Sequence, residues 1–273
     1  MPELPEVETV KRSLADKILH IPILDVEILF PKVIKFPSAE DFSAHLRGKR
    51  FVNINRRGKY LLLHLNDEHI LVVHLRMTGR LLWVKGEEAL AKHTHIVIVF
   101  ENGYQLRFQD QRQFGTLHLV HGNQLHLLPG LERLGPEPLS NLSVCGLRES
   151  LHKSRRKIKD FLLDQTVIAG IGNIYADEIL FTAALHPERP AATLTEEEVD
   201  KLYRAIISRL EAGIRHRGAS FRDYVDGEGR QGEFQTLLQV YGREGLQCFH
   251  CGSLISRKKI GGRSSCFCPT CQK

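Results

Sequence analysis

Four cysteines near the end of the chain have the spacing of a metal site. Their pattern is C-x2-C-x16-C-x2-C, formed by Cys248, Cys251, Cys268 and Cys271. Two close thiolate pairs, separated by enough chain for a hairpin, are typical of a tetrahedral zinc site. Four protein ligands leave no open coordination position, so the expected zinc ion is structural. It would hold the basic stretch RKKIGGR, residues 257 to 263, outward, with Cys266 as a bystander thiol.

A second candidate site is a turn between two expected helices, in the stretch DQTVIAGIGNIYADE at 164 to 178. Gly170 and Gly172 turn the chain there, and Asn173 stands in a cap-like position at the start of the next helix. The free N–H groups of a helix N-terminus bind anions such as phosphate. No strand precedes the glycines, which disfavours a nucleotide-binding βαβ unit. A purely structural helical turn is the alternative.

The opening residues, MPELPEVETV, contain a helix start and two residues that the helix does not explain. Pro5 suits the first helical position, and Glu6 and Glu8 lie at the positive end of the helix dipole. An amphipathic helix over residues 5 to 18 is predicted by apolar side chains at helical spacing: Val7, Val10, Leu14 and Ile18. Pro2 and Glu3 sit ahead of that helix, and the helix does not account for them.

Strand-like segments dominate the first half of the chain. Between residues 23 and 120 apolar and β-branched runs alternate with short turns, and Asn102-Gly103 between two such runs predicts a hairpin. Several strands behind one helix indicate a β-sandwich or barrel. The stretch LGPEPLSN, residues 134 to 141, reads as the linker that ends it.

After the linker the pattern becomes helical. Helices are expected over residues 145 to 163 and 173 to 185, and a third begins at Thr195, where Glu198 completes a capping box. A glycine-rich and mobile segment is expected next, before the cysteines. We therefore expect three domains: residues 1 to 135, 136 to 232 and 233 to 273.

The charge distribution suggests a polyanionic partner. The 273 residues carry a net charge of +6 with 42% hydrophobic content, enough for a real core. Basic residues gather between 47 and 59, at 152 to 159 and in the last 33 residues, whereas TEEEVD at 195 to 200 is acidic. Solvated surface is the alternative for any one cluster. No apolar run approaches a membrane span and no signal peptide is evident, so an intracellular protein is expected, which disfavours disulfides.

These motifs together resemble one known family. PELPEVET at 2 to 9, HLRMTGR at 74 to 80, DQRQFGT at 110 to 116, the stretch at 164 to 178, and GGR followed by CPTC are similar to bacterial formamidopyrimidine-DNA glycosylases. Leu4 favours this branch over the related endonuclease VIII type, which usually opens with PEGPE. The resemblance implies an α+β multidomain fold: an N-terminal helix with a β-sandwich, a helix-two-turn-helix domain and a C-terminal zinc-finger β-hairpin.

The resemblance gives Pro2 and Glu3 their chemical roles. In that family the N-terminal proline attacks C1′ of the damaged nucleotide once the initiator methionine is removed. An α-amine has a pKa of about 8, against about 10.4 for lysine, so far more of it is unprotonated near neutrality. Its adduct is an iminium, which acidifies the C2′ proton and promotes strand cleavage. Glu3 would serve as the acid and base for ring opening and proton transfer.

Further residues match the family's DNA contacts. Lys59 corresponds to the lysine that approaches the damaged nucleotide and its phosphate, and Arg263 and Asn173 correspond to residues that bind phosphates. The resemblance places Lys59 and Arg263 in the catalytic set with Pro2 and Glu3. His74 and Lys258 match further backbone contacts. Because the nucleotide must leave the duplex, a wedge and an orphan-base reader are also implied, at Met77, Arg112 and Phe114. The segment 217 to 224 resembles the loop that closes over the extruded base, with Ser220 and Tyr224 as contacts.

The resemblance implies base excision repair. The expected activities are removal of oxidised purines (8-oxoguanine and formamidopyrimidines) from double-stranded DNA, and lyase cleavage of the resulting abasic site by β,δ-elimination. The chain is expected to act as a cytoplasmic monomer. An oxidised-pyrimidine glycosylase or a non-catalytic zinc-ribbon DNA-binding protein is the alternative. The sequence departs from the family's usual residues at Thr78, Gln113, Arg217 and Cys266, of which Arg217 replaces a glycine at the expected hinge.

Overall fold

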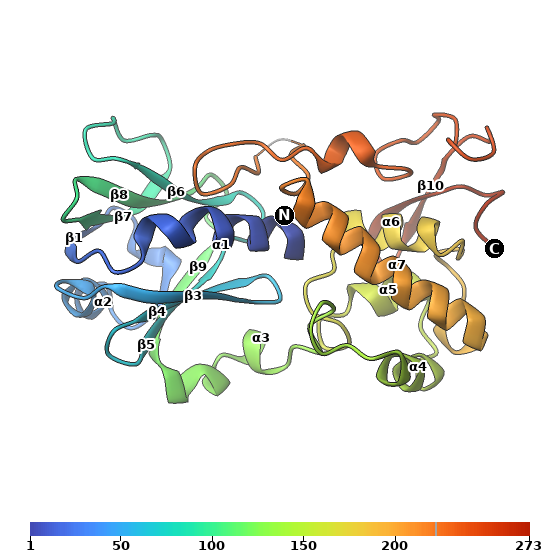
Figure 1. Cartoon of the computed structure of the whole chain (residues 1–273), viewed down its shortest axis with the longest axis horizontal. Coiled ribbons are helices and arrows are strands. Elements are labelled where there is room, and N and C mark those ends of the chain that lie inside the picture. The colour runs from blue at the N-terminus through green and yellow to red at the C-terminus, as the bar shows by residue number, and fades with distance from the viewer. Residues whose placement is uncertain (222) are drawn as a thin grey trace. The chain divides into compact units, whose positions relative to one another are not determined.

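A computed structural model describes residues 1 to 221 and 223 to 273 (Figure 1). The contacts among these residues divide the chain into two compact units. The first comprises Met1–Glu132 with His216–Glu233, and the second comprises Arg133–Arg215 with Phe234–Lys273. The segment after residue 216 thus packs with the N-terminal unit, and the cysteine-bearing segment packs with the helices. The three boundaries expected from the sequence stay a prediction.

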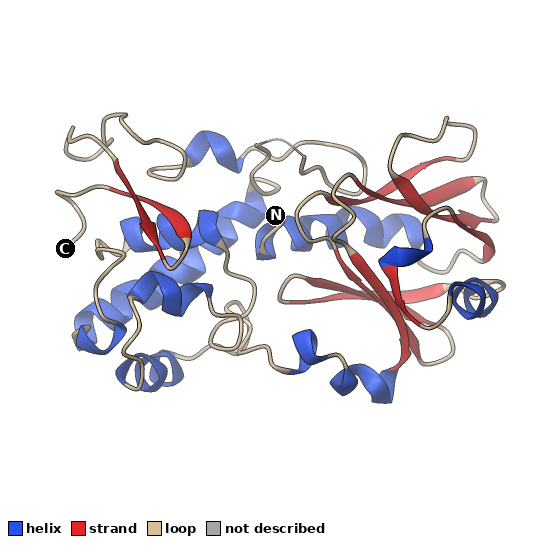
Figure 2. Cartoon of the chain, turned by 180° about the vertical axis from the view of Figure 1, so that it is seen from behind, coloured by secondary structure: helices blue, strands red, loops and turns tan. Residues whose placement is uncertain are grey.

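The first unit contains a β-sandwich and the predicted N-terminal helix, α1 (Leu4–Ile18) (Figure 2). One antiparallel sheet has the order β1 (Ile23–Ile28), β7 (Thr94–Phe100), β8 (Tyr104–Asp110), β6 (Gly79–Lys85). The other has the order β2 (Ile34–Phe36), β9 (Thr116–His121), β5 (His69–His74), β4 (Tyr60–Leu65), β3 (Phe51–Arg57), and in it β2 runs parallel to β9. The shorter helical elements are η1 (Pro31–Val33), α2 (Ala39–Leu46), η2 (Gly122–Leu127) and α3 (Pro129–Glu132).

Helix α1 forms because its apolar side chains have a sheet surface to cover. The helix contacts β3 and β4 of one sheet and β6 of the other. Val7, Val10, Leu14 and Ile18, the predicted apolar stripe, are all buried in the common core. Burial of such side chains stabilises the fold by about 1.5 to 3 kcal/mol each. Pro2 and Glu3, directly ahead of the helix, are therefore held on a rigid element.

The predicted hairpin at Asn102-Gly103 joins β7 to β8. Gly103 has a φ of 79°, in the left-handed region that favours glycine, and Val99 pairs with Gln105 across the two strands. This turn sets the register of β7 against β8, and β8 leads into the β8–β9 turn.

The second unit contains helices and one β-hairpin. Its elements are α4 (Val144–His152), α5 (Ile158–Leu163), α6 (Asn173–Thr182), η3 (Ala191–Thr193), α7 (Glu196–Arg215), η4 (Phe234–Leu237), β10 (Ser256–Ile260) and β11 (Arg263–Phe267). The capping box before α7 is confirmed: the Thr195 N–H donates to the Glu198 carboxylate at 2.9 Å, and the Glu198 N–H donates to Thr195 Oγ1 at 3.3 Å. None of the described helices is long and apolar enough to cross a bilayer.

The single helix expected over residues 145 to 163 is wrong. The chain leaves helical geometry after α4 because the connecting segment pairs with residues near 190. The Ala191 N–H donates to the Arg156 carbonyl at 2.8 Å, and the Ile158 N–H donates to the Arg189 carbonyl at 2.7 Å. These bonds use backbone groups that a continuous helix would need, so tertiary pairing overrides local propensity.

Candidate nucleic-acid interface and zinc site

The four predicted zinc ligands lie together in the second unit. Their sulfur atoms are all within 4.8 Å of one another, with Cys248 and Cys271 at 3.9 Å and Cys251 and Cys268 at 3.5 Å. A tetrahedral ion with Zn–S bonds of about 2.3 Å places its sulfurs about 3.8 Å apart. The donor set and spacing therefore fit one Zn²⁺, and four thiolates leave no coordination position for a substrate. The ion is structural.

The zinc ligands bracket the β10–β11 hairpin, which carries two of the predicted DNA contacts. Gly261 and Gly262 form its two-residue turn with φ values of 53° and 79°, the geometry that suits a twisted hairpin. Arg263 is exposed at the first position of β11, next to this turn. Lys258 is exposed on β10, where its ammonium pairs with the Glu188 carboxylate. Both cations thus lie on the strands of one hairpin.

A buried ion pair fastens this hairpin to the helices. Lys159 of α5 is 0% exposed and its Nζ lies 2.6 Å from the Asp177 carboxylate of α6. Lys159 Nζ also donates to the Ser264 carbonyl at 2.9 Å, and Asp177 accepts from Ser265 Oγ at 2.9 Å and Cys266 N at 3.0 Å. The residues directly after Arg263 are therefore bonded to both helices.

Lys159→Met should destabilise the second unit by about 3 to 5 kcal/mol, because it leaves the Asp177 carboxylate buried without its cation. Far-UV circular dichroism during urea unfolding measures the loss. Adding Asp177→Leu should recover part of it, since the uncompensated charge is then gone. Lys153→Met, at an exposed position, is the matched control and should change stability by less than about 0.5 kcal/mol. If Lys159→Met and Lys153→Met changed stability equally, the result would contradict a stabilising role of the Lys159–Asp177 pair.

Asn173 occupies the first turn of α6 beside the same hairpin. The structure moves the predicted cap by one position: Gly172 is the N-cap and Asn173 is the first helical residue. Asn173 Nδ2 donates to the Ser264 carbonyl at 3.0 Å, so the side chain joins the helix start to the hairpin next to Arg263. This contact places the start of α6 beside the strand that begins at Arg263.

In the first unit, Pro2 and Glu3 lie at the start of α1. Pro2 is buried and Glu3 is only 3% exposed. Glu3 is the N-cap of α1, and its backbone N–H donates to Glu6 Oε2 at 2.8 Å. The Glu6 carboxylate accepts in turn from the Ala219 N–H at 2.8 Å. These contacts fix the direction in which the first residues leave the helix.

Lys59 and His74 lie near each other at one end of β4 and β5. Tyr60 pairs with His74 across the strands, and their rings meet edge to face with centroids 4.5 Å apart. Burial, reinforced by the charges of Arg76 and Lys59, lowers the pKa of His74 to about 3. His74 Nδ1 accepts a hydrogen bond from the Arg76 N–H at 3.0 Å, which leaves Nε2 as the protonated, donating nitrogen.

His74 should remain the neutral Nε2–H tautomer from pH 8 down to about pH 5. Nitrogen-15 shifts of the imidazole measure this directly. Since its folded pKa lies below the unfolded value near 6.5, its contribution to stability is complete above pH 6.5 and is lost as pH falls toward 3. The imidazole of His152, exposed on α4, gives a second signal in the same spectra for comparison. A His74 that gains a proton near pH 6.5 would contradict this assignment.

The predicted wedge residues Met77, Arg112 and Phe114 are brought together by two neighbouring turns. Arg112 Nη1 lies 3.3 Å from Met77 Sδ, and its guanidinium lies over the Phe114 ring at 4.9 Å. Phe114 is 51% exposed. The β8–β9 turn that presents Arg112 and Phe114 is organised by the buried Asp110. The Asp110 carboxylate accepts from the Gly115 N–H at 2.7 Å, the Arg112 N–H at 3.2 Å and Thr78 Oγ1 of the other turn.

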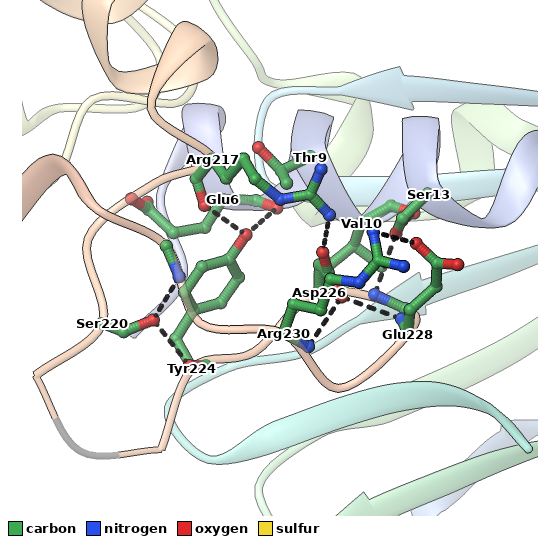
Figure 3. A network of polar contacts seen from close by, with 12 residues as sticks. Glu6, Thr9, Val10, Ser13, Arg217, Ser220, Tyr224, Asp226, Glu228 and Arg230 are labelled. Carbon is green, nitrogen blue, oxygen red and sulfur yellow. Dashed lines mark hydrogen bonds and ion pairs between the residues drawn. The ribbon is translucent and has the colours of Figure 1, made fainter.

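The segment after residue 216 is attached to α1 by a polar network (Figure 3). The Tyr224 hydroxyl donates to the Arg217 carbonyl at 3.0 Å and lies 3.3 Å from the Glu6 carbonyl. Ser220 Oγ donates to the Tyr224 carbonyl at 2.8 Å, and Arg217 pairs with the buried Asp226. Arg217 has a φ of 57°, a conformation that favours glycine. Position 222 of this expected base-covering loop lies outside the described residues.

Comparisons with known proteins agree with this arrangement. Three family models match the chain: the formamidopyrimidine-DNA glycosylase N-terminal domain over residues 1–117, the H2TH domain of the same enzymes over 134–225, and the zinc finger found in FPG and IleRS over 245–273. The chain belongs to the formamidopyrimidine-DNA glycosylase family. A relative of that name from Pelotomaculum thermopropionicum is 50% identical over 274 residues, 100% of this chain and 99% of the relative.

Solved structures of the same family match over the whole chain. A Lactococcus lactis FPG mutant in complex with a Fapy-dG containing DNA is 39% identical with a TM-score of 0.94, covering 100% of both chains. The Lactococcus lactis Fpg in complex with an abasic site containing DNA is 39% identical with a TM-score of 0.93, covering 99% of both. The predicted family and fold class are therefore confirmed for this formamidopyrimidine-DNA glycosylase family member.

Sequence reasoning missed several residues that shape the family's site in this chain. Lys159 belongs to the basic cluster at 152 to 159, yet it is wholly buried. Asp110 and Asp177 belong to the motifs at 110 to 116 and 164 to 178, in which the sequence alone gives them no role. The available signal for Asp177 was its position among the apolar residues of α6, where a charge requires a partner. Asp110 gave no comparable signal, because acidic residues in turns are ordinary.

Proposed function

We propose that this protein removes oxidised purines from double-stranded DNA and then cleaves the strand at the abasic site. The observation that carries the proposal is Pro2 with Glu3 beside it at the rigid start of α1, in a chain whose relatives bear the glycosylase name along its full length. Lys59 and His74 of the same unit and Asn173, Lys258 and Arg263 of the other are proposed phosphate contacts. Met77, Arg112 and Phe114 would fill the gap left by the extruded nucleotide.

The chemistry begins with the Pro2 nitrogen after Met1 is removed. Its lone pair attacks C1′, and the glycosidic bond from C1′ to the base nitrogen breaks with its electrons going to the leaving base. The base takes up the proton that the attacking Pro2 nitrogen releases. The O4′ bond then opens, with Glu3 as the proton donor to O4′, and the nitrogen becomes an iminium. Loss of the C2′ proton expels the 3′ phosphate, and a second elimination expels the 5′ phosphate. Proline suits the eliminations because a secondary amine forms an iminium that has no N–H proton to lose and therefore keeps its positive charge.

The zinc ion takes no part in these steps. It supplies a rigid attachment for the β10–β11 hairpin, so that Lys258 and Arg263 keep fixed positions. Arg112, with its guanidinium exposed over Phe114, is proposed to hydrogen-bond the orphaned cytosine. Ser220 and Tyr224 are proposed to contact the extruded base, although the Tyr224 hydroxyl is bonded to backbone carbonyls in the described structure.

Borohydride trapping tests the proposed intermediate. Borohydride added during turnover of a duplex containing 8-oxoguanine opposite cytosine should reduce the iminium to a stable amine and join the protein to the strand. Peptide mapping should place the adduct on Pro2. An adduct mapped to Lys59, or rapid base release without any trapped adduct, would overturn the mechanism.

The substrate range needs a second comparison. Duplexes carrying 8-oxoguanine, a formamidopyrimidine and an oxidised pyrimidine should be cleaved with the two purine lesions preferred. Preference for the pyrimidine would favour the endonuclease VIII-like alternative, and binding without any cleavage would favour the zinc-ribbon alternative. We further propose that the protein acts on the bacterial nucleoid and that it does so as a monomer. Light scattering of the free protein and of its DNA complex would test the monomeric state.

A further inference from the structure

Three potential metal ligands meet at the far end of β4 and β5 from His74. His45 lies in the last turn of α2, Asp67 lies in the β4–β5 turn and His69 begins β5. His45 Nε2 is 3.0 Å from Asp67 Oδ2, and His69 Nδ1 is 3.4 Å from Asp67 Oδ1. His69 and His74 are separated by the length of β5, about 17 Å. The cluster is therefore remote from Lys59 and His74.

The spacing of these atoms is that of ligands around one ion. Imidazole nitrogens and carboxylate oxygens bind late transition metals at about 2.0 to 2.2 Å, which places neighbouring ligand atoms about 3.3 Å apart in a tetrahedron. The two measured separations bracket that value. His45 Nε2 is also buried and makes no hydrogen bond to any described residue, although it lies next to a carboxylate oxygen. The two atoms are close, but their geometry is not that of a hydrogen-bond donor and its acceptor.

The turn that carries Asp67 is held on both sides. On one side the Asn66 N–H donates to the Arg50 carbonyl at 3.2 Å, and the Arg50 N–H donates to Asn66 Oδ1 at 3.2 Å. On the other side the Gly122 N–H donates to the Glu68 carbonyl at 2.9 Å. A metal would meet ligands already in position, which lowers the conformational cost of binding.

Two features surround the cluster. Lys49 lies beside the Asp67 carboxylate, and the His121–Glu68 pair packs beside His69. Lys49 Nζ lies 2.9 Å from Asp67 Oδ2 and would compete with an ion for that oxygen. Partial burial raises the pKa of Asp67, but Lys49, the His69 N–H and His45 outweigh it and lower the value to about 2, so the carboxylate is ionised. His121 packs edge-on against His69 with centroids 5.3 Å apart and pairs with Glu68 at 3.1 Å.

We propose that His45, Asp67 and His69 bind one divalent late transition ion, such as Zn²⁺, Ni²⁺ or Cu²⁺, as a site separate from the four cysteines. Two imidazoles and one carboxylate are a donor set that such ions favour over Mg²⁺ or Ca²⁺. The ion joins the end of α2 to the β4–β5 turn and displaces Lys49 from Oδ2.

Equilibrium dialysis of the tag-free, zinc-loaded chain against Ni²⁺ tests the site. At pH 7.5 one Ni²⁺ per chain should bind while the cysteine zinc is retained, with both metals measured by elemental analysis. His45→Ala, His69→Ala and Asp67→Asn should each weaken Ni²⁺ binding by about 100-fold or more. His152→Ala, at an exposed histidine of α4, is the matched control and should bind as the parent does.

Lys49→Met gives the opposite and more specific result. Removing the competing ammonium should tighten Ni²⁺ binding about tenfold, an effect that a merely structural polar cluster would not produce. Thermal unfolding with and without Ni²⁺ checks that each variant is folded and should show stabilisation only where Ni²⁺ binds. No Ni²⁺ beyond exchange at the cysteines, Ni²⁺ retained by the ligand variants, or weaker binding by Lys49→Met would overturn the proposal.

Discussion

A chain with an uncleaved peptide ahead of Pro2 should fold, keep its zinc and bind lesion DNA, yet release no base. The blocked nitrogen has become an amide, whose lone pair is delocalised and cannot attack C1′. Loss of a nucleophile typically lowers the rate on the order of 10⁴-fold or more. Single-turnover release of 8-oxoguanine measures this loss. The same peptide attached after Lys273 is the matched control and should leave release unchanged.

Glu3→Gln separates the nucleophile from its proton donor. The amide should retain lesion binding, because it has nearly the same shape, but it cannot protonate O4′. Turnover should fall by about 10² to 10⁴-fold, the usual contribution of general acid–base catalysis. Full base release by the blocked chain, or normal turnover by Glu3→Gln, would show that these two residues have other roles.

The features that were predictable from sequence are those set by local spacing. The C-x2-C pairs specify a zinc site because each ligand pair is formed within four residues. The apolar stripe of α1 and the Thr195 cap are likewise properties of short segments, and all three were confirmed. Their chemistry depends little on what the rest of the chain does.

The features that were missed depend on pairing between distant segments. The break between α4 and α5 arises because residues 154 to 158 pair with residues 189 to 192, which no local pattern reports. Lys159 resembles its basic neighbours in sequence but faces Asp177, so its burial follows from packing of α5 on α6. The cluster of His45, Asp67 and His69 requires α2 and the β4–β5 turn to meet, and spacing along the chain does not show that they do.

The second large effect is expected from removal of zinc, which should weaken DNA binding. The apolar cluster beneath the hairpin is small, and half of its buried members are cysteines: Phe181, Val240, Cys248, Ile255, Cys266 and Cys268. So small a core is insufficient alone, whereas a structural zinc supplies about 10 to 16 kcal/mol in zinc-finger peptides. Cys268→Ser should therefore lose both the metal and the fixed positions of Lys258 and Arg263.

The salt dependence of binding identifies this loss. Log affinity for lesion DNA falls linearly with log salt, by about 0.9 per phosphate neutralised. Losing two hairpin cations should make the slope shallower by about two, on lesion and undamaged DNA alike. Cys145→Ser, at an exposed cysteine of α4, is the matched control and should change neither zinc content nor slope.

The first unit should survive the loss of zinc, and its own chromophore reports this. The chain's one tryptophan, Trp83, lies on β6 and stacks on Tyr104 with centroids 5.1 Å apart, so its fluorescence and near-ultraviolet dichroism follow the sandwich. Zinc-free protein should keep that signal while it loses affinity. An unchanged affinity and slope after stoichiometric loss of zinc would mean that the bonds of Lys159, Asp177 and Asn173 to the hairpin are enough to position Arg263 without the ion.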